Sequence, residues 1–216
     1  MSISPFSSFP PLCAVVDVEV AARSGWTVPD LATAYLRGGA KFLQIRAKST
    51  PGVELFNWCE AIVKEARKRE GIVILNDYAD LAKLSGADGV HVGQDDLSPE
   101  EVRHIVGTQP VIGLSTHTLS QIRDGARGSA SYLALGPVSA THTKKTGYPV
   151  VGLDMVRLAV KMTQKPIVAI GGITLQSAPG VLRAGACSVA VISDLLATGD
   201  PEHRVREYLE VLIRNN

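Results

Sequence analysis

Short runs of apolar residues alternate along the chain with longer segments in which apolar residues recur at helical spacing. Eight runs are rich in Val, Ile, Leu or Ala, and their length and flanking glycine or polar residues predict β-strands. The predicted strands cover residues 12–17, 42–46, 72–76, 89–91, 111–114, 132–135, 167–170 and 188–192. The predicted helices cover residues 28–36, 53–69, 99–106, 119–126, 153–162, 175–183 and 201–213, and residues 78–84 are expected to form a short connection.

Three predicted helices begin after a hydroxyl-bearing residue that can cap them. Thr27, Ser98 and Thr118 each stand directly before the first helical residue. Ser98 is followed by Pro99 at the first helical position and by Glu101 three residues on, which is the pattern of a capping box.

The alternation of strands with helices predicts a parallel sheet. Eight strand–helix units in 216 residues fit an α/β fold of the single-domain (β/α)8-barrel type. An open doubly wound sheet is the alternative, but no GxGxxG motif follows the first strand. We therefore expect one domain over residues 1–216, in which residues 1–10, rich in Ser and Pro, form a loose N-terminal arm.

Amino-acid composition and net charge limit the classes of function that the protein can have. Hydrophobic residues make up 45% of the chain and aromatic residues only 5%, so the core must be aliphatic, as suits strands buried on both faces. A net charge of +1 supplies no field to attract nucleic acid or a membrane surface. Three scattered cysteines give neither a disulfide framework nor a zinc site. We expect a cytoplasmic protein with small-molecule substrates, and leave association into a homo-oligomer open.

The functional groups of a barrel lie where its strands end, so the residues at these positions are the candidates for a site. The second strand ends in a segment where Gln44, Arg46 and Lys48 alternate and therefore share one side. Two cations and an amide at the barrel mouth indicate an anion site. The alternative is a structural salt bridge inside the barrel.

Carboxylates follow the third and fourth strands. Asn76 and Asp77 end the third strand, and Asp95 and Asp96 follow the fourth. Two carboxylates from neighbouring strands could hold Mg²⁺, which leaves further positions for water and phosphate oxygens. In the alternative interpretation, one of Asp95 and Asp96 caps the next helix and Asp77 pairs with Arg46.

The later strands end in hydroxyl groups and glycines. The fifth strand ends near Ser115 and His117. In the alternative interpretation, Ser115 belongs to a turn and His117 makes a structural hydrogen bond. The sixth leads to a long loop in which Thr141, Thr143 and Lys144 could clasp a phosphate, unless the loop is a plain mobile surface loop.

The seventh and eighth strands end where many barrels bind phosphate. Gly171 and Gly172 follow the seventh strand and would let a phosphate approach the backbone, while Ile192 and Ser193 follow one unit later. Together these strand ends predict a site for two anionic ligands and a divalent metal.

At these strand ends the sequence resembles the thiamine-phosphate synthase family, which includes the TenI-type thiazole tautomerases. The matching stretches are residues 44–48, 76–77, 89–96, 113–117, 136–138, 141–144 and 170–173, in order over nearly the whole chain. The resemblance implies an enzyme, a transferase, that joins a hydroxymethylpyrimidine diphosphate to a thiazole phosphate and releases pyrophosphate, with Mg²⁺.

The resemblance also implies roles for individual residues. Those expected to bind the diphosphate and the pyrimidine are Gln44, Arg46, Lys48 and Asn76. Asp77 and Asp96 would be the magnesium ligands. Ser115 and Lys144 would contact the leaving pyrophosphate, and with Arg46 and Lys48 they form the expected catalytic set. The residues expected at the thiazole phosphate are Thr141, Thr143, Gly171, Ile192 and Ser193.

The sequence departs from the family pattern at two places. Tyr78 stands where many members have a basic residue, which concerns binding of the diphosphate. Ser139-Ala140 stands where members usually have an aromatic residue and a proline, which concerns closure of the loop after the sixth strand. The tautomerase branch places a histidine after the glycine that ends strand six, where this chain has Pro137. The alternatives to the synthase are therefore this tautomerase and a non-catalytic barrel that binds a phosphorylated metabolite.

Overall fold

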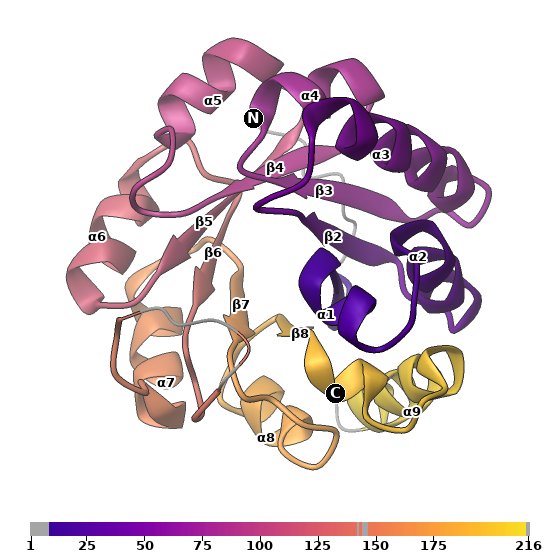
Figure 1. The fold of residues 1–216 in the computed structure, drawn as a ribbon. Helices are drawn as coiled ribbons and strands as arrows, with labels where there is room; N and C mark the ends of the chain where they lie inside the picture. The colour runs from indigo at the N-terminus through magenta and orange to yellow at the C-terminus, as the bar shows by residue number, and fades with distance from the viewer. Residues whose placement is uncertain (1–8, 142, 144–146, 215–216) are drawn as a thin grey trace.

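The computed structural model describes residues 9–141, 143 and 147–214, and these form a closed barrel of eight parallel strands in sequence order. Helices surround the strands on all sides (Figure 1). The strands are β1 (Leu12–Asp17), β2 (Phe42–Arg46), β3 (Ile72–Asn76), β4 (Gly89–Val92), β5 (Val111–Thr116), β6 (Tyr132–Leu135), β7 (Ile167–Ile170) and β8 (Ser188–Val191). The predicted single-domain (β/α)8 barrel is confirmed.

The helices lie close to their predicted positions. They are α1 (Val18–Arg23), α2 (Val28–Arg37), α3 (Gly52–Arg67), α4 (Ala79–Ser85), α5 (Pro99–Val106), α6 (Leu119–Arg127), α7 (Gly152–Met162), α8 (Ala178–Arg183) and α9 (Pro201–Ile213), with a 3-10 turn, η1 (Ser193–Leu196), after β8. Thr27, Ser98 and Thr118 cap their helices as predicted, and Ser98 forms both halves of a capping box with Glu101.

Three α-helices differ from the expectation by more than two residues. The connection over residues 78–84 is largely helical, as α4. Helix α1 was not predicted, and it forms because the Asp17 carboxylate accepts a hydrogen bond from the Val20 amide at 3.0 Å. Helix α8 begins three residues late because Thr174 and Ser177 exchange hydrogen bonds in a turn.

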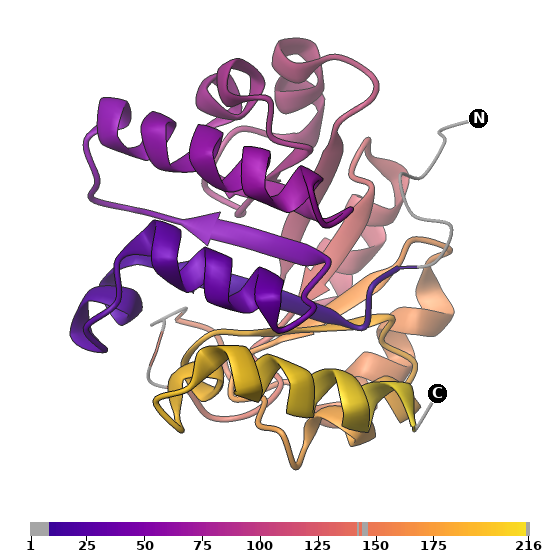
Figure 2. The same ribbon diagram turned by 90° about the vertical axis from the view of Figure 1, so that its right-hand side faces the viewer.

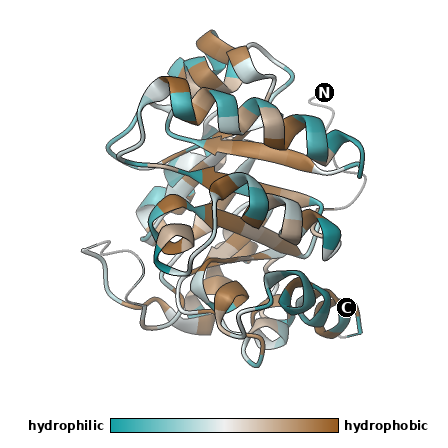
Figure 3. Cartoon of the chain, turned by 45° about the vertical axis from the view of Figure 1, so that its right-hand side comes forward, coloured by the Kyte–Doolittle hydropathy of each residue, from teal (hydrophilic) through white to brown (hydrophobic). Residues whose placement is uncertain are grey.

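Alternation along the strands divides the core in two. Residues such as Cys13 and Val15 point into the barrel, and Leu12, Ala14 and Val16 pack against the helices. The hydropathy colouring shows apolar strands enclosed by helices whose outer faces are polar (Figure 3).

Phe9 helps to fill the amino-terminal end of the barrel. Its ring contacts the rings of Phe42 and Tyr132, which begin β2 and β6, at centroid distances of 5.4 and 5.6 Å. The chain thus enters β1 at the end of the barrel opposite the long loop after β6 (Figure 2). Residues 1–8 of the predicted arm lie outside the described residues. In the described part of the chain, no helix is both long and apolar enough to span a membrane.

Candidate active site

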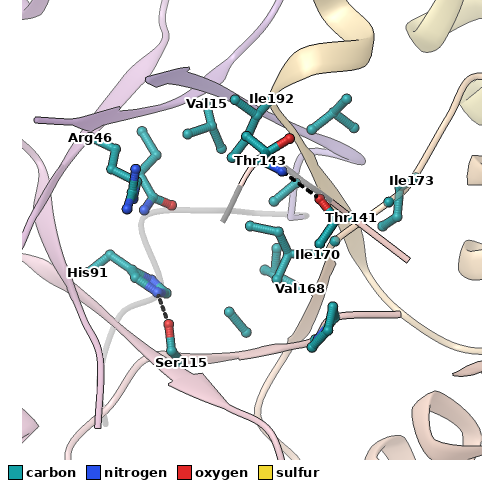
Figure 4. A pocket seen from close by; sticks show the side chains of 18 of the residues that line it. Val15, Arg46, His91, Ser115, Thr141, Thr143, Val168, Ile170, Ile173 and Ile192 are labelled. Atoms are coloured by element: carbon teal, nitrogen blue, oxygen red, sulfur yellow. Dashed lines mark hydrogen bonds between the residues drawn. The ribbon is translucent and has the colours of Figure 1, made fainter. Parts of the chain in front are cut away.

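A pocket opens at the carboxyl ends of the strands (Figure 4). The apolar part of its lining comes from the barrel interior and includes Val15, Ala134, Val168, Ile170 and Ala190. One side, from β2 to β6, carries Gln44, Arg46, Asn76, His91, Ser115 and Tyr132. The other side carries Thr141, Thr143, Gly171, Gly172, Ile192 and Ser193. The pocket therefore has an apolar interior between two polar sides.

Most residues predicted for the site line this pocket. They are Gln44, Arg46, Asn76, Ser115, Thr141, Thr143, Gly171, Ile192 and Ser193. Lys48, Asp77 and Asp96 are not part of its wall, and they form a separate group beside Asn76. Lys144 lies outside the described residues.

Gln44 and Asn76 are joined across neighbouring strands. The Gln44 amide Nε2 donates to Asn76 Oδ1 at 2.8 Å, and both side chains are buried. Gln44 lies opposite Ile74, which points into the barrel, and Asn76 lies two residues beyond Ile74 on the same strand, so both side chains point inward. The hydrogen bond fixes the orientation of both amides at the pocket wall.

Arg46 forms a structural salt bridge, as one alternative interpretation allowed, but its partner is not the Asp77 that the other alternative named. Its guanidinium donates to Asp17, which lies opposite it in the β1–β2 register, and not to Asp77. Asp17 is only 2% exposed and also caps α1. A guanidinium carries five N–H donors, so this ion pair orients Arg46 and leaves it able to bind an anion in the pocket.

Asp77 and Asp96 face each other. Burial and then the hydrogen bond and negative charge of Asp96 raise the pKa of Asp77 to about 6, against the opposing charge of Lys48, whose Nζ lies 3.9 Å away. The Asp96 carboxylate accepts from the Gly93 amide at 2.7 Å. Neither Asp95 nor Asp96 caps α5, because Ser98 does so, and the capping interpretation is wrong.

This pair of carboxylates suits a divalent cation. Two like charges held together raise a carboxyl pKa, and a bound cation relieves that repulsion. Among the described residues, no group of three or more His, Cys, Asp or Glu side chains is arranged to hold a metal. Mg²⁺ commonly takes only one or two carboxylates and completes its shell with water and substrate phosphate. The donor set therefore fits Mg²⁺ in company with a phosphorylated ligand.

Hydroxyl groups from two loops meet on the opposite side of the pocket. The Thr143 and Ser193 hydroxyl oxygens are 3.2 Å apart, and the Thr143 amide donates to the Thr141 hydroxyl at 3.3 Å. These residues follow β6 and β8, which flank β7 in the sheet, so the parallel order of these strands brings the two loops together.

Gly171 and Gly172 are needed for loop packing. Their φ angles are +98° and +65°, and a Cβ at Gly171 would lie 2.6 Å from Pro137. The loop after β6 lies directly on this turn, with the Ser139 amide donating to the Gly171 carbonyl at 2.9 Å. Glycine is therefore required here by contact between the two loops, whichever ligand binds beside them.

Two polar residues of the pocket lining, His91 and Tyr132, were not predicted, and His117 was named only as a strand-end residue with a structural hydrogen bond as its alternative role. His91 and Tyr132 point into the barrel from β4 and β6, and His117 follows β5. His117 is held by a 2.6 Å hydrogen bond between its Nδ1 and the Gly136 carbonyl and by stacking on Tyr148. The available signal for His91 was a polar residue at an inward position of an apolar strand.

One departure from the family pattern lies next to Asp77. Tyr78 precedes α4 and is partly buried against the core between barrel and helices. Like Lys48, Asp77 and Asp96, it is not part of the pocket wall.

Known proteins resemble the chain over almost its full length. The model of the thiamine monophosphate synthase family matches residues 12–195. A thiamine-phosphate synthase of Koribacter versatilis is 44% identical over 94% of this chain and 96% of that protein. The corresponding protein of Caldicellulosiruptor saccharolyticus is 35% identical, with 85% and 83% covered.

A solved structure agrees with these relatives. The thiamine phosphate pyrophosphorylase of Pyrococcus furiosus superposes with a TM-score of 0.87 and 27% identity, covering 95% of this chain and 96% of that one. The family predicted from the strand-end motifs is thus confirmed, and it is a family of transferases. The chain belongs to the thiamine monophosphate synthase family.

Proposed function

We propose that this protein is a thiamine-phosphate synthase, which couples 4-amino-5-hydroxymethyl-2-methylpyrimidine diphosphate to 4-methyl-5-(2-phosphooxyethyl)thiazole. The observation that carries the proposal is the pocket with two polar sides separated by apolar barrel residues. Two flat heterocycles would occupy the apolar interior, and their anionic groups would extend to the two sides. The family membership supports the same reaction.

The diphosphate belongs on the side formed by β2 to β5. Arg46 is oriented there by Asp17, and Lys48 lies 3.9 Å from Asp77. Asp77 and Asp96 would hold Mg²⁺, which when bound supplies positive charge against the diphosphate oxygens. The amides of Gln44 and Asn76, fixed by their mutual hydrogen bond, would orient the pyrimidine.

The thiazole phosphate belongs on the other side. The hydroxyls of Thr141, Thr143 and Ser193 and the turn at Gly171 would bind it, with Ile192 beside the ring. Lys144 is proposed to contact the leaving pyrophosphate from the same loop.

The reaction breaks the bond between the pyrimidine methylene carbon and the diphosphate oxygen. The electron pair leaves with pyrophosphate, and the aminopyrimidine stabilises the resulting cation by electron donation. The thiazole nitrogen then forms the new carbon–nitrogen bond, so no protein nucleophile is needed. Arg46, Lys48 and Lys144 would neutralise the charge developing on the leaving group, and the Ser115 hydroxyl would donate a hydrogen bond to it. Alignment of the two rings by the pocket would supply much of the rate.

A turnover assay with both substrates tests the proposal. Purified protein would be assayed with magnesium and with chelator, following thiamine phosphate and pyrophosphate. Magnesium-dependent formation of both products in equal amounts supports the synthase. Absence of product from folded protein at saturating substrate and magnesium would contradict it.

Asp96→Asn gives a sharper test because Asp95 offers a matched control. We expect Asp96→Asn to lower turnover by about 100-fold, since one of two proposed metal ligands loses its charge. Asp95→Asn removes the same charge from the neighbouring exposed residue and should leave turnover unchanged. Equal losses in both variants would argue against a magnesium site at Asp96.

The tautomerase remains the second candidate within the family. His117 reaches the carbonyl of Gly136, close to where that branch places a histidine, although its ring is held by Tyr148. The same protein preparation, assayed for isomerisation of the thiazole phosphate precursor, separates the two activities.

A further inference from the structure

A hydrogen-bonded series of three side chains runs across the barrel interior along the pocket wall. The Tyr132 hydroxyl lies 2.9 Å from His91 Nδ1, and His91 Nε2 lies 2.8 Å from the Ser115 hydroxyl. The side chains come from β6, β4 and β5 and all contribute to the pocket lining (His91 and Ser115 are joined in Figure 4). Tyr132 and His91 are only 1% and 5% exposed.

Gly113 makes the contact between Tyr132 and His91 possible. In the sheet register it pairs with His91 on one side and with Tyr132 on the other, so it stands between them. A Cβ at this position would lie 2.3 Å from the Tyr132 hydroxyl oxygen and 2.4 Å from His91 Nδ1. A side chain on β5 would therefore occupy the space in which the two residues meet.

Burial of the Tyr132 hydroxyl determines the direction of its hydrogen bond with His91. Burial raises the pKa of Tyr132 well above its ordinary value, so the phenol keeps its proton. Within the described residues, His91 is the one hydrogen-bond partner of this hydroxyl. If Nδ1 carried a proton, the phenolic proton would be buried without an acceptor, which is costly. The phenol therefore donates to Nδ1.

The same reasoning extends to Ser115. With Nδ1 as acceptor, the neutral imidazole carries its proton on Nε2 and donates it to the Ser115 oxygen. The Ser115 hydroxyl then keeps its own proton for another acceptor. The Gln94 amide meanwhile holds the Ser115 carbonyl at 2.6 Å, which fixes the end of β5.

We propose that Tyr132, acting through His91, sets the direction of the Ser115 hydroxyl so that its proton points to an anion in the pocket. Tyr132 and His91 are thus positioning residues, and Ser115 is the group that touches the ligand. The identification of that anion as the leaving pyrophosphate rests on the proposed function. The direction of the hydrogen bonds among Tyr132, His91 and Ser115 is independent of the proposed function.

Tyr132→Phe tests the inference because it removes only the hydroxyl. Without that donor, the contact that kept the proton off Nδ1 is lost, so a tautomer with its proton on Nδ1, in which Nε2 accepts the Ser115 proton, becomes populated. We expect ¹⁵N spectra of histidine-labelled, ligand-free protein to show this change of tautomer. Tyr35→Phe is the matched control, since its buried hydroxyl has no hydrogen-bond partner among the described residues and should leave the tautomer unchanged. An unchanged His91 tautomer in folded Tyr132→Phe would overturn the inference.

Binding and turnover give the second readout. We expect Tyr132→Phe to weaken binding of magnesium pyrophosphate about tenfold, with a similar loss of kcat and an unchanged KM for the thiazole phosphate. In a Ser115→Ala background the same substitution should have almost no further effect. Equal losses in both backgrounds would overturn the inference. Pyrophosphate binding is measured without turnover, so a protein that lacks synthase activity still tests it.

Discussion

Asp77 combines an unusual backbone conformation with an unfavourable environment for its charge. Its φ angle of +69° lies in the left-handed region, which Asn and Asp adopt more readily than most residues. Burial and the neighbouring Asp96 raise its pKa from 3.8 to about 6. The residue therefore costs stability at neutral pH, as is common for groups that are retained for binding.

We expect Asp77→Asn to stabilise the metal-free protein at high pH and to lose magnesium binding. Below the ordinary pKa the carboxyl is protonated in both states and contributes nothing. As the pH rises to about 6, the unfolded chain releases the proton first, so the free energy of unfolding falls and stays lower above that pH. Asn removes this loss, which is on the order of 2 kcal/mol.

Urea unfolding in chelator measures the effect. The variant should be more stable than the wild type near pH 8, and the difference should be much smaller near pH 4. A difference that is the same at both pH values would mean that the charge of Asp77 is not the cause.

At the scale of elements, Asp194 ties three segments together. Its carboxylate accepts from the Tyr208 hydroxyl at 2.6 Å, from Arg204 Nη2 at 2.8 Å and from the Leu175 amide at 3.2 Å. It thereby connects η1 to α9 and to the loop after β7. Ser193, the neighbour of Asp194, lies at the proposed phosphate side of the pocket.

Asp194→Ala should therefore affect stability and one substrate. We expect a loss of about 3 kcal/mol in the free energy of unfolding, because Arg204 and Tyr208 lose a partly buried acceptor. The KM for the thiazole phosphate should rise several-fold while that for the pyrimidine diphosphate changes little. Steady-state kinetics with each substrate varied in turn measures this difference.

Ser98→Ala is the control for Asp194→Ala, because it also destabilises one helix. It removes the capping box of α5, which should cost about 1 kcal/mol of stability. Helix α5 lies across the barrel from α8 and α9 (Figure 1), so both KM values should stay unchanged. A rise in both KM values in Asp194→Ala would show a general loss of structure instead.

Across the whole molecule, the two ends of the barrel have different tasks. The pocket lies at the carboxyl ends of the strands, and the amino-terminal end is closed by packing and by polar side chains that bind loop carbonyls. Lys165, just before β7, is one of these, and its ammonium donates to the carbonyls of Gly125 and Gly128 at the end of α6.

Lys165→Met should lower stability without changing catalysis. The carbonyls at the end of α6 would lose their cationic donor, at a cost of about 1–2 kcal/mol. Lys161→Met, which removes an exposed lysine from α7, should cost almost nothing. Thermal unfolding and steady-state kinetics measure the two effects. A change in kcat for Lys165→Met would contradict the separation of the two ends.

The sequence by itself determined the order of the eight strands and of seven of the helices, because apolar spacing and helix caps are local properties. Strands β1, β2, β3, β6 and β7 have the bounds that the pattern predicts. Which strand-end residues point to one side also follows from alternation along each strand. The candidate residues of the pocket were therefore predictable, and so was the family, from motifs that lie at those strand ends.

Tertiary structure alone decided which of these side chains meet. Arg46 pairs with Asp17 because β1 and β2 set them in register, and Gly113 lets Tyr132 reach His91 across β5. The turn at Gly171 is fixed by Pro137, a residue from another loop. These contacts depend on strand register and on the packing of neighbouring strands and loops, which are set between segments distant in sequence and not by the residues of any one segment.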